Sequence, residues 1–384
     1  MKHIFSVWHD EYRTIFSDAG VLLLFVGAIL LYPFFTSSAY ITEVLKDIPV
    51  AVIDLDHSQL SRTFIRMLDA HESLEVDTSL SDMTDARGRL LERKFFAIIS
   101  IPHDFQKKTL RNTQAVISVL CDASYFYVYQ QTKKGIAETA GTLSARIEVQ
   151  RLMAQGMPPA HALNVQNPFS LLPIPLYNPS GGYASYAMPA VMVMVLQMTL
   201  LMGIGMLGGT AREHMQPEAT DTTSHAAGIT ATIIGKGGAY LTLYAVHAVF
   251  FFAVLYRFFG FPQRGDFLDA ALFTLPFLLA VIFLGLTLVA LFRERELSVV
   301  GLIFVSVPGL FMVGFSWPVE SMPSWIRMIS LLLPSTAGID GFIRIHQMGA
   351  TLQDVSFDVT ILWGLAMLYF TTACVVAKYL RLKE

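Results

Sequence analysis

The chain has 384 residues, of which 54% are hydrophobic and only 15% are charged. An ordinary soluble domain carries about 25% charged residues, so the composition argues against a soluble protein and indicates membrane segments. The net charge of −3 gives no sign of a nucleic-acid partner, and two cysteines are too few for a cysteine-based metal site.

The N-terminal segment, residues 1–18, predicts a helix that lies in the cytoplasmic membrane interface. Its apolar residues recur at helical spacing, with polar residues mostly between them. Phe5, Trp8 and Tyr12 are the residues expected at the level of the lipid headgroups. The alternative is that this segment is only the frayed start of the first membrane span.

Six stretches are long and apolar enough to span a membrane, which takes roughly 20 residues. They are residues 19–42, 183–210, 237–256, 270–292, 297–319 and 359–377. The first is too long, and follows too polar a segment, to be a cleaved signal peptide. Lysine and arginine collect in cytoplasmic loops, and their moderate bias here predicts that both termini are cytoplasmic. Residues 43–182 then lie outside the cytoplasm.

Residues 43–182 predict a small α/β domain. Short apolar runs at residues 50–55, 73–78, 95–101 and 115–121 alternate with helical patterns, as in α/β folds. A long proline-free helix is expected over residues 125–157, and a proline-rich segment then returns the chain to the membrane.

Three polar residues after the first strand, Asp54, Asp56 and His57, raise the question of a metal or acid–base site. Asp54 and Asp56 share one face of a strand, so such a geometry is possible. No second group of histidines or carboxylates stands at ligand spacing to complete a metal site. The favoured interpretation is structural: the cluster closes the strand, and Asp56 or Ser58 caps the next helix.

The second span carries Gly205 and Gly209 in a G-x-x-x-G pair, a weak signal for close helix packing. The polar loop that follows, residues 209–228, suits a docking surface and a solvated connection equally well. The ATP-binding pattern G-x-x-x-x-G-K-[ST] is absent. In the nearest segment, GITATIIGKGG, Gly237 stands where the magnesium-binding hydroxyl belongs.

Charge inside the spans is scarce. Ion-driven transporters usually need ionisable groups near the middle of the membrane, and only His247 qualifies. A single histidine there is more often a partner in a helix–helix hydrogen bond than a proton relay. The energy source for any transport is therefore expected on another chain.

Residues of about 320–350 predict two short outer helices rather than a seventh span. The apolar piece over residues 324–333 lies between Pro323 and Pro334 and is half the length of a span. The following piece carries Asp340 and Arg344.

In their order and spacing, these features resemble the permeases of type-2 ABC exporters, in the subgroup with a large extracytoplasmic domain between the first two spans. The resemblance covers most of the chain and is carried by three segments. They are IPVAVIDLDHSQLSR, YNPSGGYASYAMPAVMVMVLQMTLLMGIGMLGGTAREH and GFSWPVESMPSWIRMISLLLPSTAGIDGFIRIHQMGA. The expected fold is an α-helical membrane protein of six transmembrane helices, with the α/β domain and its long helix inserted after the first and residues 183–384 forming the others.

The resemblance implies an exporter subunit of a Gram-negative inner membrane, without an ATPase site of its own and with an unidentified substrate. A separate cytoplasmic subunit would hold ATP and magnesium, and would dock near Arg212, Glu213 and His214. The interfacial helix would correspond to residues 2–17. Further partners implied are a second permease copy or paralogue, a periplasmic adaptor (membrane fusion) protein and membrane lipid. The alternatives are an ion-coupled secondary transporter and a membrane-anchored receptor or scaffold.

Overall fold

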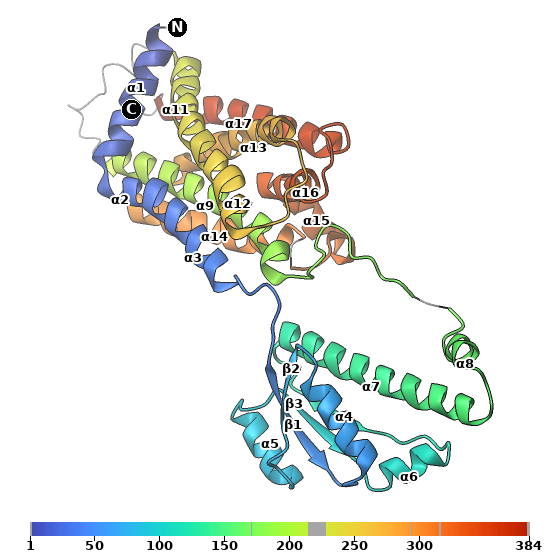
Figure 1. Cartoon of the computed structure of the whole chain (residues 1–384). Helices are drawn as coiled ribbons and strands as arrows, with labels where there is room; N and C mark the ends of the chain where they lie inside the picture. The colour runs from blue at the N-terminus through green and yellow to red at the C-terminus, as the bar shows by residue number, and fades with distance from the viewer. Residues whose placement is uncertain (1, 170, 214–227, 293, 315, 382–384) are drawn as a thin grey trace. The chain divides into compact units, whose positions relative to one another are not determined.

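The computed structural model describes residues 2–169, 171–213, 228–292, 294–314 and 316–381. The chain forms two compact units (Figure 1). Unit 1 comprises residues 1–43 and 175–384 and is helical, whereas unit 2 comprises residues 44–174 and combines a sheet with helices. The predicted inserted domain, residues 43–182, begins one residue before unit 2 and ends eight residues after it.

Unit 1 begins with α1, Lys2–Ser17, and continues through a helix in three parts: α2, Ala19–Leu22; η1, Leu23–Ala28, which is π-helical; and α3, Ile29–Ala39. The other helices are α9, Tyr183–Glu213; α11, Ile229–Val249, continued by η2, Phe250–Leu255, and α12, Tyr256–Phe259; α13, Phe267–Leu288, continued by η3, Val289–Leu291; α14, Arg295–Met312; η4, Val319–Ser321; α15, Ser324–Ser330; α16, Pro334–His346; and α17, Ser356–Arg381.

Within the described ranges, five helices are long and apolar enough to cross a membrane. They are Ala19–Ala39, Tyr183–Glu213, Ile229–Phe259, Phe267–Leu288 and Ser356–Leu380, and each coincides with a predicted span. The predicted span at residues 297–319 falls on α14, which is not among the five and ends at Met312. The chain is therefore a helical membrane protein, whose described residues hold five candidate spans, or six if a bent helix pair is counted as one.

The bent pair consists of α15 and α16, whose axes differ by 84°. Pro334 opens α16 in the first turn, where its missing N–H group breaks no hydrogen bond. Two short helices are thus present where residues 320–350 predict them, and their place in the membrane stays a prediction.

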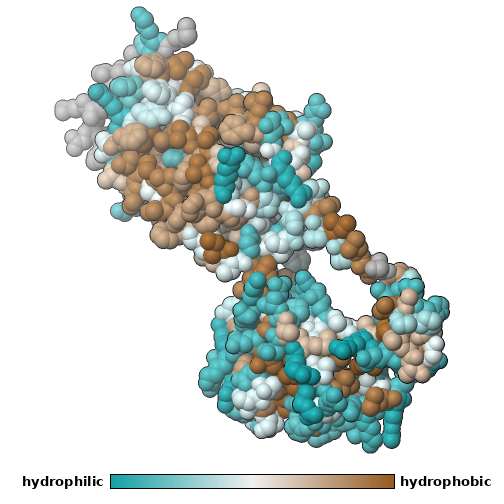
Figure 2. Space-filling model, in the orientation of Figure 1, coloured by the Kyte–Doolittle hydropathy of each residue, from teal (hydrophilic) through white to brown (hydrophobic). Residues whose placement is uncertain are grey.

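The α9 helix lies at the centre of unit 1. In the most apolar stretch of α9, 78% of the residues are buried inside the structure, compared with 22% in the first and the last candidate spans. Those outer helices present apolar side chains on the surface, and Figure 2 shows hydrophobic residues over much of the visible face of unit 1. The visible face of unit 2 is mostly hydrophilic, as expected for a domain in water.

Unit 2 is built on a four-stranded sheet in the order β2-β1-β3-β4. Strand β1, Ile48–Asp54, runs parallel to β2, Leu74–Asp77, and to β3, Ala97–Ile101, whereas β4, Ser118–Cys121, is antiparallel to β3. The helices are α4, Gln59–Asp69; α5, Met83–Leu91; α6, Phe105–Leu110; α7, Phe126–Ala154; and α8, Pro159–Gln166.

Helices cover both faces of this sheet, and for that reason β1 reads as a continuous apolar run. Val50 and Val52 pack towards α4, α6 and α7, while Ala51 and Ile53 pack on the opposite face with Ala86 of α5. The predicted α/β fold with a long helix is therefore present. Its position outside the cytoplasm stays a prediction.

Candidate functional site

The inner face of α1 packs against α11. Val7, Glu11 and Ile15 lie on this face at helical spacing and are buried. At Gly235 of α11 a Cβ atom would lie 2.8 Å from Val7 Cβ and 2.9 Å from the carbonyl oxygen of Ile4. The crossing is therefore close enough to require glycine on α11.

Glu11 carries the charge at this crossing. Its carboxylate lies 3.0 Å from Lys236 Nζ and accepts a hydrogen bond from the hydroxyl of Tyr240. Burying a carboxylate without partners is costly, and these two partners on α11 offset that cost. Glu11 thus fixes α1 to the first half of α11.

The aromatic residues of α1 form a row beside this face. Successive ring centroids of Phe5, Trp8, Tyr12 and Phe16 are 5.5, 4.6 and 6.0 Å apart. Phe5 and Phe16 are mostly exposed, and Trp8 and Tyr12 are half-buried. The Tyr12 hydroxyl lies 2.8 Å from that of Thr242 on α11. An exposed aromatic row suits the headgroup region of a bilayer, which is the place predicted for Phe5, Trp8 and Tyr12.

Arg212 and Glu213, at the end of α9, contact the segment that leads into α14. Arg212 Nη1 donates to the carbonyl oxygen of Phe292 at 2.6 Å. Glu213 Oε1 accepts from the backbone N–H of Arg295 at 2.7 Å, satisfying one of the free N–H groups at the start of α14. Both side chains therefore join α9 to α14 within the chain. His214, the third predicted coupling residue, lies outside the described residues.

Gly205 and Gly209 lie on the side of α9 that faces α14. A Cβ atom at Gly205 would be 2.5 Å from Leu302 Cδ1, and one at Gly209 would be 2.6 Å from Arg295 Cα. The second contact is with backbone, which cannot rotate away as a side chain can. The two helices therefore touch backbone to backbone at Gly209.

The side chain of Arg295 connects this contact to the first span. Its Nη2 donates to Asp18 Oδ1 at 2.7 Å, and its Nη1 bonds to Asp18 Oδ2 and, at 2.9 Å, to Thr210 Oγ1. Asp18 stands directly before α2, and Thr210 belongs to the last turn of α9. We name Asp18, Thr210, Glu213 and Arg295 together the Arg295 junction.

Asp18 is held in its charged form. The hydrogen bond from the Arg295 guanidinium is the main cause, the N–H groups of Val21 and Gly20 add to it, and partial burial opposes it. Together these effects lower the pKa of the Asp18 carboxyl to about 2. The N–H groups of Gly20 and Val21 donate to Asp18 Oδ1 at 2.9 and 3.0 Å, so the same carboxylate also caps α2.

Sequence patterns mark this region only in part. Asp18 stands immediately before a long apolar run, which is the position of a helix N-cap and a usable signal. Glu11 shares the helical spacing of Val7 and Ile15, but a carboxylate in an apolar stripe has no specific meaning until its partners are known. Nothing in the sequence predicts that Arg295 pairs with Asp18, because 277 positions separate them.

In unit 2, Asp54 holds the turn after β1. Its Oδ1 accepts from the N–H groups of Asp56 and His57, both at 3.1 Å, and its Oδ2 accepts from the Ser61 hydroxyl at 2.7 Å. These bonds connect the strand to the first turn of α4, as the structural interpretation of the cluster predicts.

Asp56 and Ser58 are both used as caps, each on a different helix. Ser58 accepts from the N–H of Ser61 at the start of α4, and Asp56 accepts from the N–H of Gln106 at 3.0 Å in α6. Burial raises the pKa of Asp56, but bonds from the Ser58 hydroxyl and from backbone N–H groups around Gln106 outweigh it and lower the pKa. Across the described parts of the chain, no group of three or more His, Cys, Asp or Glu residues could hold a metal ion.

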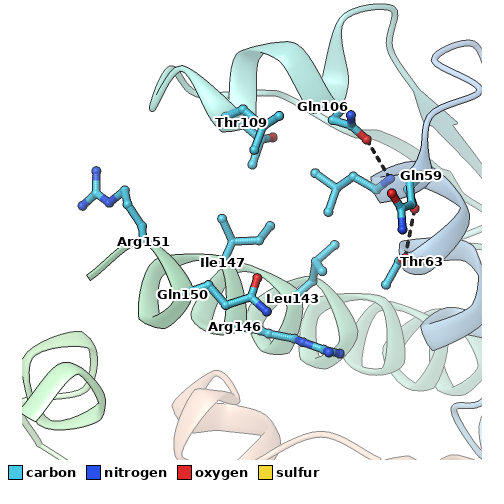
Figure 3. A pocket seen from close by; sticks show the side chains of 11 residues that line it. Gln59, Thr63, Gln106, Thr109, Leu143, Arg146, Ile147, Gln150 and Arg151 are labelled. Carbon is cyan, nitrogen blue, oxygen red and sulfur yellow. Dashed lines mark hydrogen bonds between the residues drawn. The ribbon is translucent and has the colours of Figure 1, made fainter. Parts of the chain in front are cut away.

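A cleft of about 600 Å³ lies in unit 2 between α4, α6 and α7 (Figure 3). Its lining is apolar at Leu60, Leu143 and Ile147 and polar at Gln106 and Arg146. Gln106 Oε1 accepts from the N–H of Leu60 at 3.0 Å, which fixes that amide in the wall. An apolar wall with a few amide and guanidinium groups is the chemistry of a site for small amphiphilic molecules.

Comparison with known proteins identifies the family. A family model described as "ABC-2 family transporter protein" matches residues 19–375, which is most of the chain. The chain is similar to the "Probable multidrug ABC transporter permease YbhR" of Escherichia coli K12, with 20% identity over 362 residues, or 92% of this chain and 90% of the relative.

A second similarity is shorter. The "Inner membrane transport permease YhhJ" of Escherichia coli K12 is 32% identical over 125 residues, which are 32% of this chain and 32% of YhhJ. The match thus spans about a third of the length of that relative, and a counterpart from Shigella flexneri matches equally. With a family model that extends from the first to the last candidate span, the chain belongs to the ABC-2 family of transporter proteins.

Proposed function

We propose that this chain is the membrane subunit of an ATP-driven exporter and that a separate ATP-binding subunit supplies the energy. Membership of the ABC-2 family supports this, together with a sequence that has no P-loop of its own. The main support for a docking site here is the contact of Glu213 with the start of α14. Glu213 ends α9 directly before a polar sequence, and its contact joins that end of α9 to a second long helix. ATP and magnesium would be held by the partner.

The proposed topology places both termini, α1 and the Arg295 junction on the cytoplasmic side of an inner membrane. Residues 43–182, including unit 2, then lie on the opposite side. The distribution of lysine and arginine supports this orientation, and the similarity to an inner membrane permease supports the choice of membrane. A second copy of the chain, or a paralogue, completes the pathway, and a periplasmic adaptor (membrane fusion) protein is a further partner.

The substrate class that we propose to test first is small drug-like molecules. YbhR, which is similar over 92% of this chain, is named as a probable multidrug permease, and this supports that choice. The cleft of Figure 3, with its apolar and amide-lined walls, is a place where such a molecule could first be held after transport.

A docking test must leave the contacts within the chain intact. Arg212 bonds to Phe292 before α14 and Glu213 bonds to the first residue of α14, so exchanging their charges would disturb the fold as well as any partner. Ala211 is exposed in the same turn. Ala211→Arg adds bulk and charge to that surface, and we expect it to reduce co-purification of the ATP-binding subunit.

The matched control is Ala123→Arg, an exposed alanine of unit 2. Each variant would be co-expressed with an ATP-binding subunit from the genome that encodes the permease, purified, and assayed for ATP hydrolysis in proteoliposomes with a panel of cationic dyes. Equal co-purification and hydrolysis for Ala211→Arg and the parent would remove this surface from the docking site. An ATPase that binds neither protein would contradict the proposed function.

A further inference from the structure

We infer that Arg295 is a positioning residue that makes the start of the first span, the end of α9 and the start of α14 move as one body. The inference rests on the proposed function, since the movement in question is the one that an ATP-binding subunit would impose next to Glu213. Its physical basis is that the backbone of Arg295 is bonded to α9, while its side chain is bonded to Asp18 at the start of the first span.

The backbone of Arg295 is held by α9. Its N–H donates to Glu213, and its Cα lies so close to Gly209 that no Cβ atom fits between them. A displacement of the last turn of α9 therefore displaces the first turn of α14 directly. Further along, Gly205 lies against Leu302, so the contact between the two helices continues beyond the first turn.

The side chain of Arg295 extends the same body to the first span. The guanidinium binds both oxygens of Asp18 and also Thr210. The planar guanidinium matches the carboxylate with two parallel bonds while a further N–H reaches the hydroxyl, and the compact ammonium of lysine lacks this fixed geometry. The guanidinium also lies 2.5 Å from where a Cβ atom at Gly20 would stand, so glycine leaves room for it there.

The N-terminal helix is fixed to the same body at its far side. Asp18 follows the last residue of α1, Ser17, and α1 is separately held on α11 through Glu11 and Lys236. Movement at Glu213 thus reaches α14 and the first span through direct contacts, and α1 through its chain connection at Asp18. A positioning role of this kind differs from docking, because neither Asp18 nor Thr210 needs to touch the partner.

The test compares four proteins: the parent, Asp18→Asn, Arg295→Gln and the double variant. Asparagine caps a helix as well as aspartate does, so Asp18→Asn removes the ion pair but keeps the cap on α2. Spin labels would be placed at Arg13→Cys on α1 and Val300→Cys on α14, both exposed, in a chain whose two native cysteines are replaced by serine.

In nanodiscs without any partner, the parent should show one narrow distance distribution between the labels. Each single variant should broaden this distance distribution about twofold. The double variant should give a distribution no broader than that of the broader single variant, because the two substitutions remove the same interaction. Arg295→Lys should broaden it less than Arg295→Gln. Equal widths in all four proteins would overturn the inference.

A second measurement adds the ATP-binding subunit and traps nucleotide with vanadate. The distance in the parent should stay the same while the ATPase is bound, because the labelled helices move together, and a shift of its maximum would also overturn the inference. If the ATPase does not bind the parent, the proposed function fails, yet the widths measured in the permease alone still decide whether Arg295 holds these helices together.

Discussion

At the scale of single residues, the lowered pKa of Asp18 gives a measure of how strongly Asp18 pairs with Arg295. Its pKa of about 2, against an ordinary value of 3.8, means that folding favours the charged carboxylate. A shift of this size corresponds to about 2 kcal/mol of stabilisation, because one pKa unit is about 1.4 kcal/mol. Only 17% of the Asp18 side chain is exposed, so solvent screens the pair incompletely.

The pH dependence of this stabilisation has a definite sign. A carboxylate with a lowered pKa in the folded state contributes fully above the unfolded value of 3.8 and loses its contribution as the pH falls towards about 2. We expect Asp18→Asn to lower the unfolding temperature by a constant amount between pH 8 and 5, and the difference to shrink below about pH 4. Thermal unfolding of both proteins at pH 7, 5 and 3 checks this. A difference that grows on acidification would contradict it.

Gly209 provides a steric prediction at the same scale. Gly209→Ala would bring a Cβ atom to 2.6 Å from Arg295 Cα, and the helices must separate to accept it. Overpacking of this kind typically costs about 1–3 kcal/mol, so the variant should unfold at a clearly lower temperature. Gly364→Ala in α17 is the control, since no atom lies within 4 Å of the added Cβ there and alanine favours a helix. Equal unfolding temperatures for the two variants would refute the backbone contact.

At the scale of elements, α1 depends on one buried charge. Glu11→Ala leaves the Lys236 ammonium and the Tyr240 hydroxyl without the carboxylate that both contact. Leaving the buried Tyr240 hydroxyl without its acceptor typically costs about 1–3 kcal/mol, so α1 should separate from α11 more often while the spans stay folded. Limited proteolysis in nanodiscs measures this as faster cleavage within residues 2–17. His9→Ala, at an exposed position of α1, should be cleaved at the parental rate, and equal rates for both variants would argue against the prediction.

The elements themselves could largely be predicted from residue patterns. Short apolar runs locate the strands of unit 2 to within about three residues, because the sheet buries them. Long uncharged runs locate five spans, although the span predicted at residues 237–256 extends over Ile229–Phe259. α14 is different: its sequence stays apolar to residue 319, but the helix ends at Met312 and Gly314 has a positive φ of 86°. Hydropathy shows only that a segment is apolar, and it does not show at which residue within that segment the helix ends.

The candidate site was much less predictable than the elements. Arg212 and Glu213 stand out in the sequence as an exposed pair of charges, yet the structure engages both with the start of α14. Whether a surface charge is available to a partner depends on which helix lies beside it, and that contact comes from a segment about 80 positions away. Asp56 is a similar case: its place after β1 predicts a cap on the next helix, α4, but its carboxylate caps α6, 50 positions away, and Ser58 caps α4.

At the scale of the whole molecule, the family model and the five to six candidate spans establish a membrane transporter subunit, while the orientation rests on charge alone. The predicted orientation places unit 2 outside the cytoplasm. Ser79 is exposed in unit 2, in the segment between β2 and α5, so a thiol there would be accessible to reagents.

We expect Ser79→Cys, in a chain with both native cysteines replaced by serine, to react in intact cells with a thiol reagent that does not cross the inner membrane. The control is Ser17→Cys, exposed at the end of α1, which should react only after the inner membrane is permeabilised. The physical reason is that lysine and arginine near the ends of short loops are retained on the cytoplasmic side, whereas a folded domain is translocated largely regardless of its charge. Labelling of Ser17→Cys alone in intact cells would invert the topology. It would place the Arg295 junction outside the cytoplasm, where no ATP-binding subunit could reach it.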